Sequence, residues 1–298
     1  MKVLLLGRGG QLGRGLQAEL AARFELVALD RGGCDLADPA QLRATIAQVR
    51  PAAIVNAAAY TAVDRAESDE ASAVAVNARA PGIIGEEAAR LGAAVIHYST
   101  DYVFDGQKSS PYTESDATHP LGAYGRSKRD GELALIASGA RALTLRASWV
   151  VGAQGANFAR TMLRLARERD RLGVVADQHG VPTPVPLLAR VTAELLERIA
   201  ADRAAPFPWG LYHVAPSGRT NWFEYARLVL AAAEHAGHVL KVAATAIQPL
   251  ATADYPTAAR RPANSCLDTA RFRSTFGIPL PAWQDGLHEV LHQILSTP

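Results

Sequence analysis

The chain has 298 residues, of which 49% are hydrophobic, so it can form one large domain or a domain with a smaller appendage. The 31 Lys and Arg residues nearly balance the 29 Asp and Glu residues, and neither sign forms a block. This balance argues against a nucleic-acid groove and against a basic membrane-binding face. We therefore expect a small-molecule partner, with no nucleic acid and no membrane.

The N-terminal apolar run ends at Gly7, which makes it too short for a signal sequence or a spanning helix. A cytoplasmic location is therefore expected. The two cysteines, Cys34 and Cys266, lie far apart and have no His or Cys neighbours at ligand spacing. Neither a disulfide framework nor a zinc site is predicted, and both are expected to be free thiols.

Strands and helices are predicted to alternate through the first half of the chain. Leu12, Leu16 and Leu20 recur at helical spacing after a short apolar run that ends in glycines. Such alternation indicates an α/β fold with a doubly wound parallel sheet of the Rossmann type, covered by helices on both faces. The predicted strands are 2–6, 25–29, 53–56, 93–99 and 141–147, and the predicted helices are 11–23, 39–49, 69–91 and 124–138.

After residue 150 the alternation loosens, and loops rich in Pro and Gly separate the remaining helices. Pro182, Pro184 and Pro186 occupy alternate positions, which argues against a helix there and favours an extended segment. We predict a dinucleotide-binding domain over 1–150, to which 185–215 returns, and a smaller substrate-binding domain over 151–298. The helices expected here are 158–169, 187–201, 222–236 and 284–295, with one further strand over 211–214.

Three glycines, Gly7, Gly10 and Gly13, separate the first strand from the first helix. Backbone amides in such a loop can approach a pyrophosphate at the positive end of the helix. The spacing is G-x-x-G-x-x-G and not G-x-G-x-x-G, so an ordinary turn is the alternative reading. Its position directly after the first strand favours a dinucleotide site.

Asp30 ends the second strand, where a carboxylate can accept hydrogen bonds from the adenosine ribose of NAD. Arg31 follows it and could pair with the 2'-phosphate of NADP, with Arg8 as a second candidate. These two signals conflict, and both residues could also be solvated residues leaving a strand. We predict NADPH as the cofactor, with NADH also accepted.

Tyr124 and Lys128 are one helical turn apart, so both can reach one ligand. A nearby ammonium favours the ionised phenol, which would make Tyr124 a better proton relay at working pH. Thr100, at the end of the fourth strand, can hydrogen-bond a substrate carbonyl. A Tyr-x-x-x-Lys pair alone is weak evidence, because any surface helix can contain one. The position of this pair in the chain, after the glycine loop and Thr100, favours a reductase site.

Longer motifs run through most of the chain: 10–13 (GQLG), 56–64 (NAAAYTAVD), 98–104 (YSTDYVF), 146–150 (RASWV), 157–165 (NFARTMLRL), 177–183 (DQHGVPT) and 255–265 (YPTAARRPANS). Through these motifs the chain resembles the extended short-chain dehydrogenase/reductase family and, within it, reductases of nucleotide-linked 4-keto-6-deoxysugars. The resemblance implies hydride transfer from NAD(P)H to C4 of a dTDP-linked ketosugar, with Thr100, Tyr124 and Lys128 as catalytic residues.

The same resemblance assigns the binding residues. Around the cofactor, besides the glycines, Asp30, Arg31, Tyr124 and Lys128, it places Gln11, Leu12, Asp35, Leu36, Ala59, Tyr60, Thr61 and Tyr98. On the substrate it places Thr100, Asp101, Tyr102, Trp149, Asn157, Arg260 and Asn264.

Several of these residues have simpler explanations. Trp149 could equally be a core residue capping the fifth strand. Arg260 and Arg261 suit a pyrophosphate clamp, because guanidinium forks match phosphate oxygens, but they could also form a solvated basic loop. His97 is expected to be a satisfied core histidine, and the role of His179 is left open.

Other functions compete with this interpretation. A related 4-ketosugar reductase or an epimerase of the same superfamily is nearest. A dehydratase would need an Asp-Glu pair after Thr100, whereas Asp101 is followed by Tyr102. A non-catalytic, NADP-binding regulatory subunit is a further alternative. The complete set of Thr, Tyr and Lys residues argues against it.

Some bacterial proteins that the chain resembles dimerise through a magnesium ion held by three glutamates. Here Gly15, Pro186 and Gln293 occupy those places, and none of them has a carboxylate. Magnesium requires charged oxygen ligands. We therefore predict no metal, and a monomer or a metal-independent homodimer.

Overall fold

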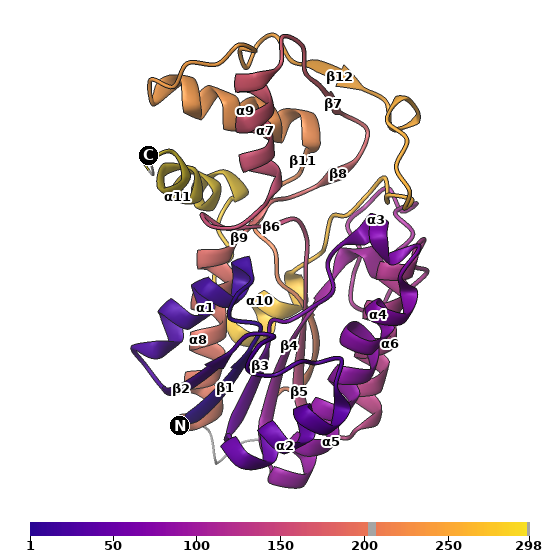
Figure 1. Cartoon of the computed structure of the whole chain (residues 1–298), viewed down its shortest axis with the longest axis vertical. Helices are drawn as coiled ribbons and strands as arrows, with labels where there is room; N and C mark the ends of the chain where they lie inside the picture. The colour runs from indigo at the N-terminus through magenta and orange to yellow at the C-terminus, as the bar shows by residue number, and fades with distance from the viewer. Residues whose placement is uncertain (202–206, 297–298) are drawn as a thin grey trace.

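The computed structural model describes residues 1–201 and 207–296, and its centre is a six-stranded parallel sheet (Figure 1). The strand order is β10-β5-β4-β3-β1-β2. In register, Leu6 pairs with both Leu29 and Asn56, and Thr100 pairs with Ala147. The strands are β1 (Lys2–Leu6), β2 (Glu25–Leu29), β3 (Ala53–Asn56), β4 (Ala94–Thr100), β5 (Arg141–Ala147) and β10 (Gly210–His213).

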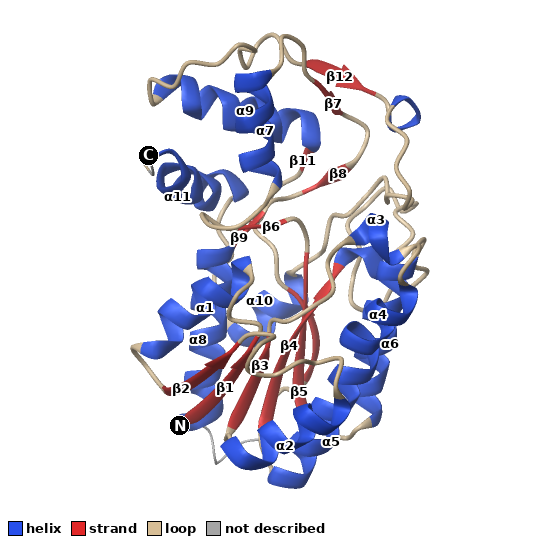
Figure 2. Cartoon of the chain, viewed as in Figure 1, coloured by secondary structure: helices blue, strands red, loops and turns tan. Residues whose placement is uncertain are grey.

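Helices cover both faces of this sheet, as Figure 2 shows. Side chains alternate along each strand, so Val3 and Leu5 pack on one face while Leu4 and Leu6 pack on the other. The predicted doubly wound α/β fold is therefore confirmed. One face carries α1 (Gln11–Ala21), α8 (Val185–Ala201) and α10 (Ala270–Phe276), and the other carries α2 (Pro39–Val49), α5 (Ala80–Leu91) and α6 (Ala123–Ala137).

The helix expected over 69–91 is not regular. It consists of α4 (Glu70–Val74), a π-helical turn (Ala75–Arg79) and α5. Pro81 has no N–H to donate to the carbonyl of Asn77 four residues earlier, which explains why the α-helical pattern is interrupted here. The prediction of one uniform helix is wrong at this point, and Asn77 is left facing the site.

A second hydrophobic core lies beyond the carboxyl edge of the sheet. Three helices form it, with Leu163, Val229 and Leu287 among the buried side chains. Short strand pairs, which were not predicted, accompany this core and are separate from the six-stranded sheet. The elements are α7 (Phe158–Glu168), α9 (Trp222–His235) and α11 (Trp283–Leu295), with the strand pairs β7 (Gly173–Val175) and β12 (Gln248–Leu250), β8 (His179–Gly180) and β11 (Thr220–Asn221), and β6 (Val150–Val151) and β9 (Thr183–Pro184). A four-residue α3 (Val63–Ala66) follows β3.

The alternating prolines are extended only in part. Thr183 and Pro184 form β9, but Pro186 lies in the first turn of α8, so the prediction of an extended segment is wrong there. A proline is tolerated in a first turn because its missing N–H has no intrahelical acceptor. β10 pairs with β5, so part of 185–215 adjoins the sheet, although residues 202–206 lie outside the described residues. The division at residue 150 stays a prediction.

Both cysteines are free thiols, as predicted, and both are buried. Within 1–201 and 207–296, no helix combines the length and the apolar character needed to span a membrane.

Candidate active site

The glycine loop lies where the strand order reverses, between β1 and β3. Gly7 has φ +89°, and a Cβ there would lie 2.6 Å from the backbone nitrogen of Ala58. A Cβ on Gly13 would lie 2.0 Å from the Gly7 carbonyl oxygen. Both positions therefore require glycine, which fixes the close packing of α1 against the sheet.

Gly10 differs from these two glycines because it faces open space. A Cβ there would meet nothing closer than the Gly7 oxygen at 3.6 Å. Gly10 is also the N-cap of α1, and no side chain caps this helix. The first amides of α1 are thus available to an anion, so the loop fits a dinucleotide pyrophosphate.

The residues expected to favour NAD or NADP belong to two separate ion pairs. Arg8 Nε donates to Asp30 Oδ2 at 2.9 Å, and this bond is the largest factor lowering the pKa of Asp30. Arg31 Nε donates to Asp35 Oδ2 at 3.2 Å, but its side chain is 84% exposed. Arg8 thus neutralises Asp30, while Arg31 stays accessible.

The remaining predicted cofactor residues differ in their surroundings. Leu36 is packed in the core beneath α2. Tyr98 points its hydroxyl at Thr192 of α8, so its ring lies in the core on the α1 and α8 face. Ala59 is partly buried and Thr61 is exposed, next to Tyr60 in the loop after β3.

Asn77 fixes that loop, and sequence reasoning missed it. Its Oδ1 accepts from the backbone nitrogen of Tyr60 at 2.8 Å, and its Nδ2 donates to the backbone oxygen of Tyr60 at 2.9 Å. The same Nδ2 donates to Ser127 Oγ on α6 at 3.0 Å. Asn77 therefore ties the loop after β3 to the helix that carries Tyr124 and Lys128. The only signal in the sequence was an asparagine among alanines and valines.

Lys128 is buried on α6, with only 2% of its surface exposed. Its Nζ donates to the backbone oxygen of Tyr98 at 2.7 Å, which aims the ammonium at the end of β4. Burial lowers the pKa of Lys128 to about 8, and the charge of Glu132 one turn later opposes this shift. Lys128 therefore remains largely protonated at neutral pH.

Tyr124 lies on the same face of α6, with its ring edge on to Tyr102 at 5.6 Å between centroids. Burial raises the pKa of Tyr124 to about 12, the charge of Asp101 adds to the rise, and a hydrogen bond with Thr100 opposes it. The expectation that Lys128 favours an ionised phenol is therefore wrong for this structure, because burial determines the pKa of Tyr124 and the Lys128 ammonium does not contribute to its shift. Tyr124 is a neutral phenol that has a proton to give.

Thr100 ends β4 and lies between two polar groups. Its Oγ1 donates to Asp101 Oδ1 at 3.1 Å and accepts from Tyr102 N at 3.2 Å. Thr100 and Asp101 are 6% and 2% exposed. The structure thus brings Thr100, Asp101, Tyr102, Tyr124 and Lys128 together at the carboxyl edge of the sheet.

Trp149 follows β5 in the left-handed region, with φ 45°, which is uncommon for a large non-glycine residue. Its ring stacks on Trp222 at 3.7 Å between centroids. Its carbonyl accepts from Thr183 N at 3.1 Å. Trp149 therefore packs against the second core where the chain leaves the sheet, and Trp222 is a partner that the sequence did not indicate.

Gln11 and Asn157 link the glycine loop to the second core. Gln11 Oε1 accepts from Gly152 N at 3.0 Å and from Asn157 Nδ2 at 3.1 Å. Asn157 is also the N-cap of α7, where its Oδ1 accepts from Arg160 N at 3.0 Å. Its side chain is thus engaged by the protein itself.

The two arginines of the predicted phosphate clamp, Arg260 and Arg261, have different surroundings. Arg261 Nη2 pairs with Asp64 Oδ2 at 2.7 Å, whereas Arg260 is exposed. Asn264 Nδ2 donates to the backbone oxygens of Lys108 at 2.7 Å and Ser110 at 2.9 Å. Asn264 therefore holds two loops together, and Arg260 is the member of the Arg pair that is accessible.

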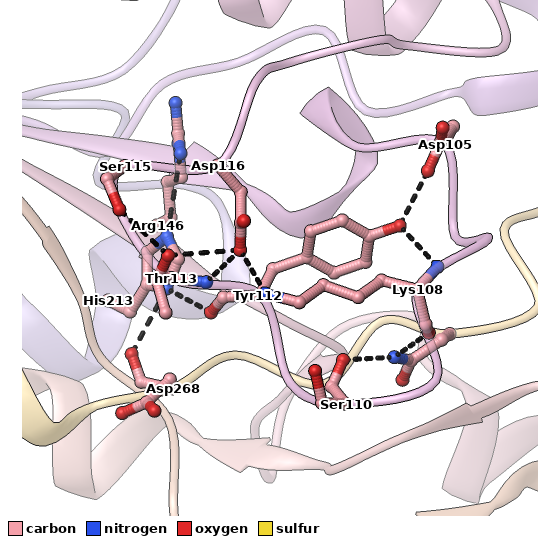
Figure 3. A network of polar contacts seen from close by, with 11 residues as sticks. Asp105, Lys108, Ser110, Tyr112, Thr113, Ser115, Asp116, Arg146, His213 and Asp268 are labelled. Carbon is pink, nitrogen blue, oxygen red and sulfur yellow. Dashed lines mark hydrogen bonds and ion pairs between the residues drawn. The ribbon is translucent and has the colours of Figure 1, made fainter.

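A polar network joins these loops to the sheet (Figure 3). The Tyr112 hydroxyl donates to Asp105 at 2.6 Å, and Lys108 pairs with Asp116 at 2.6 Å. His213 is fully buried, and burial together with the nearby Arg146 lowers its pKa to about 3. This network fixes the segment that follows Thr100 and Asp101.

The two histidines considered above differ in their contacts. His97 is buried, and Asn56 Nδ2 approaches its Nδ1 at 3.1 Å, but its Nε2 has no hydrogen-bond partner among the described residues. The predicted core position is thus correct, although the ring is only half satisfied. His179 is partly buried between β11 and Asn264, and burial lowers its pKa.

The described ranges contain no group of three His, Cys, Asp or Glu side chains that could hold a metal ion. At Gly15, a Cβ would lie 2.2 Å from Val185 of α8, which leaves no room for a longer side chain. The absence of a structural metal stays a prediction.

The sheet topology, the open helix N-terminus and the adjoining Tyr, Lys and Thr define a Rossmann-type oxidoreductase site. Comparison with known proteins gives the family. Residues 1–296 match the RmlD substrate binding domain family, and the chain belongs to it.

Similar proteins cover nearly the whole chain. A dTDP-4-dehydrorhamnose reductase of Burkholderia thailandensis is 44% identical, over 99% of this chain and 100% of that protein. One of Shigella flexneri is 45% identical, over 100% of this chain and 99% of that protein. A crystal structure of the Bacillus anthracis dTDP-4-dehydrorhamnose reductase with NADP superposes with a TM-score of 0.89 and 32% identity, covering 98% of this chain and 99% of that one. The predicted family resemblance is confirmed.

Proposed function

We propose that the chain reduces the C4 keto group of dTDP-4-dehydro-L-rhamnose to give dTDP-L-rhamnose, with NADPH as the reductant. The similar proteins agree on this reaction by name along their whole length, and one of their structures contains NADP. The predictions of an oxidoreductase and of its reaction are thereby supported at the level of the family. Acceptance of NADH, a cytoplasmic location and a monomer or metal-independent dimer remain predictions.

The observation that carries the proposal is the convergence of Thr100, Tyr124 and Lys128 at the carboxyl end of β4. Ligands of open α/β sheets bind at this edge, beside the strand-order switch. A bound dihydronicotinamide would supply the hydride. The glycine loop would hold the pyrophosphate, and Arg31 would be the accessible cation for a 2'-phosphate.

Tyr124 would protonate the substrate oxygen as hydride reaches C4. A phenol with a raised pKa keeps its proton until negative charge develops on the neighbouring oxygen, which is the behaviour of a general acid. Thr100 would polarise the same carbonyl by a hydrogen bond. Lys128, fixed by the Tyr98 carbonyl, would stabilise the phenolate that remains and orient the nicotinamide ribose.

Arg260 would approach the substrate diphosphate, since it is exposed at the end of the loop that Asn264 anchors. Trp149, held against Trp222, would form a wall of the sugar site.

The test is turnover of dTDP-4-dehydro-L-rhamnose by the purified protein, with NADPH and with NADH, followed by loss of reduced-nicotinamide absorbance and by product analysis. We expect one equivalent of NADPH to be consumed for each dTDP-L-rhamnose formed. Reduction of another 4-ketosugar alone would assign a different substrate, and cofactor binding without any turnover would favour a regulatory subunit.

A further inference from the structure

Asp101 has an unusual environment for a carboxyl group. It is 2% exposed, and none of the ion pairs among the described residues includes it. Its Oδ1 accepts from Thr100 Oγ1 at 3.1 Å, while its Oδ2 is buried with no hydrogen bond of regular geometry in the described structure, although the Ser265 hydroxyl lies close enough to the carboxyl group to lower its pKa. A buried carboxylate with an unpaired oxygen and no cation is costly, so this environment favours the neutral acid.

Thr100 has a single hydroxyl proton, and this proton points at Asp101. The Thr100 oxygen already accepts from Tyr102 N at 3.2 Å. With Asp101 ionised, Thr100 can therefore only accept a hydrogen bond from Tyr124. With Asp101 protonated, the carboxyl can donate to Thr100 instead, and the Thr100 proton becomes free to point at the Tyr124 oxygen or at a substrate carbonyl.

We propose that Asp101 is a positioning residue whose protonation decides whether the Thr100 hydroxyl donates toward Asp101 or toward the reacting oxygens. This role rests on the proposed function, and it differs from contact with the sugar because Asp101 acts through Thr100. Only the acid form leaves Thr100 able to stabilise charge on the Tyr124 oxygen or on the ketone oxygen. Hydride transfer is consequently faster when Asp101 is neutral.

The groups around Asp101 leave it as the titrating residue near pH 6. Burial raises the pKa of Asp101 to about 6, opposed by the hydroxyls of Ser265 and Thr100. Burial also raises the pKa of Tyr102, Tyr124 and Cys266, and the charge of Asp101 adds to each rise, so these three stay neutral in this range.

No other charged group among the described residues contributes to the pKa shift of Asp101. Arg219 acts on Cys266, whose pKa it lowers. Arg261 lowers the pKa of Tyr102, but it is itself paired with Asp64 at 2.7 Å. Lys128 has a pKa lowered by burial to about 8, so it sets a separate alkaline limit. A step in rate near pH 6 is therefore assigned to Asp101.

The test compares kcat and KM with the ketosugar and NADPH from pH 5 to 9 for the wild type and Asp101→Asn. We expect wild-type kcat to fall as the pH rises through 6. Asp101→Asn keeps a neutral side chain that can donate to Thr100, so its kcat is expected to stay level from pH 5 to 7, below the alkaline limit that Lys128 sets, and to exceed that of the wild type by roughly tenfold at pH 8, where both proteins share that limit. Its KM should change by less than about threefold, because no sugar contact is removed.

Two further variants separate this role from a structural one. Glu87→Gln removes another buried carboxylate, on α5, which pairs with Arg43 of α2 and not with any residue of the site, and it should keep the wild-type pH profile. Thr100→Val should lose the step near pH 6 whatever its remaining rate, while Thr100→Ser should keep it. These variants test the proposal even if Asp101→Asn folds poorly.

The outcomes that overturn the proposal are distinct. A pH profile unchanged in Asp101→Asn, or a step that persists in Thr100→Val, overturns the positioning role alone. An effect of Asp101→Asn confined to KM for the ketosugar makes Asp101 a sugar ligand instead. No turnover by the wild type at any pH overturns the proposed function, and this proposal with it.

Discussion

Replacing Asp101 with Asn should stabilise the protein above pH 6. The carboxyl is buried without an ion pair, and burial raises its pKa from 3.8 to about 6. A rise of about two units corresponds to roughly 3 kcal/mol, because each unit is worth about 1.4 kcal/mol. This is the free energy that ionised Asp101 costs the folded state, and an uncharged amide of the same shape avoids it.

The sign of this effect fixes its pH window. The folded-state pKa lies above the unfolded one, so well below pH 4 both states are protonated and the substitution changes little. Between pH 4 and 6 the unfolded chain ionises first, and the wild type loses stability as the pH rises. Above pH 6 the full difference of about 3 kcal/mol should favour Asp101→Asn, less whatever the amide loses in hydrogen bonding.

Urea unfolding at pH 4, 6 and 8, without ligands, measures this difference. Glu87→Gln is the matched control with the opposite sign, because its hydrogen bonds from Arg43 and Arg90 outweigh burial and lower the pKa of Glu87. That variant should be less stable than the wild type at pH 8. If Asp101→Asn is also destabilised at pH 8, the carboxylate has a stabilising partner and the reasoning fails.

Three further predictions concern the cofactor, the acid and the assembly. Tyr124→Phe should lower kcat by about 10²- to 10⁴-fold with NADPH binding nearly intact, and retention of more than roughly a third of kcat would remove Tyr124 as the acid. Gly13→Ala places a Cβ 2.0 Å from the Gly7 oxygen, so calorimetry should show at least about tenfold weaker NADPH binding, and an unchanged Kd would refute the assigned loop. EDTA should change neither turnover nor the mass found by sedimentation; a chelator-sensitive dimer restored by magnesium would contradict this expectation.

The sheet could be predicted because its strands are short, buried and separated by glycines or amphipathic helices. The strand over 141–147 and the helix beginning near Tyr124 have nearly the predicted bounds. The short strands around the second core could not be predicted, because two- or three-residue pairs such as β6 and β9 have no periodicity to recognise. Their pairing depends on tertiary packing.

At the site, the residue types were predictable but their environments were not. Asn77 acquires its role from a π-helical turn that Pro81 helps to create, and Asp101 acquires a raised pKa only from burial. The error at Tyr124 has the same origin, since sequence spacing placed Lys128 nearby but could not reveal that desolvation dominates. Whether desolvation or a neighbouring charge determines a pKa depends on the packed structure.

The most direct measurement of the central claim is the stoichiometry of the reaction of purified protein with dTDP-4-dehydro-L-rhamnose and NADPH. The geometry of Thr100, Tyr124 and Lys128 predicts one NADPH oxidised per dTDP-L-rhamnose produced, with this product lost in Tyr124→Phe. Tight NADPH binding with no reduction of the ketosugar, or undiminished reduction by Tyr124→Phe, would contradict it.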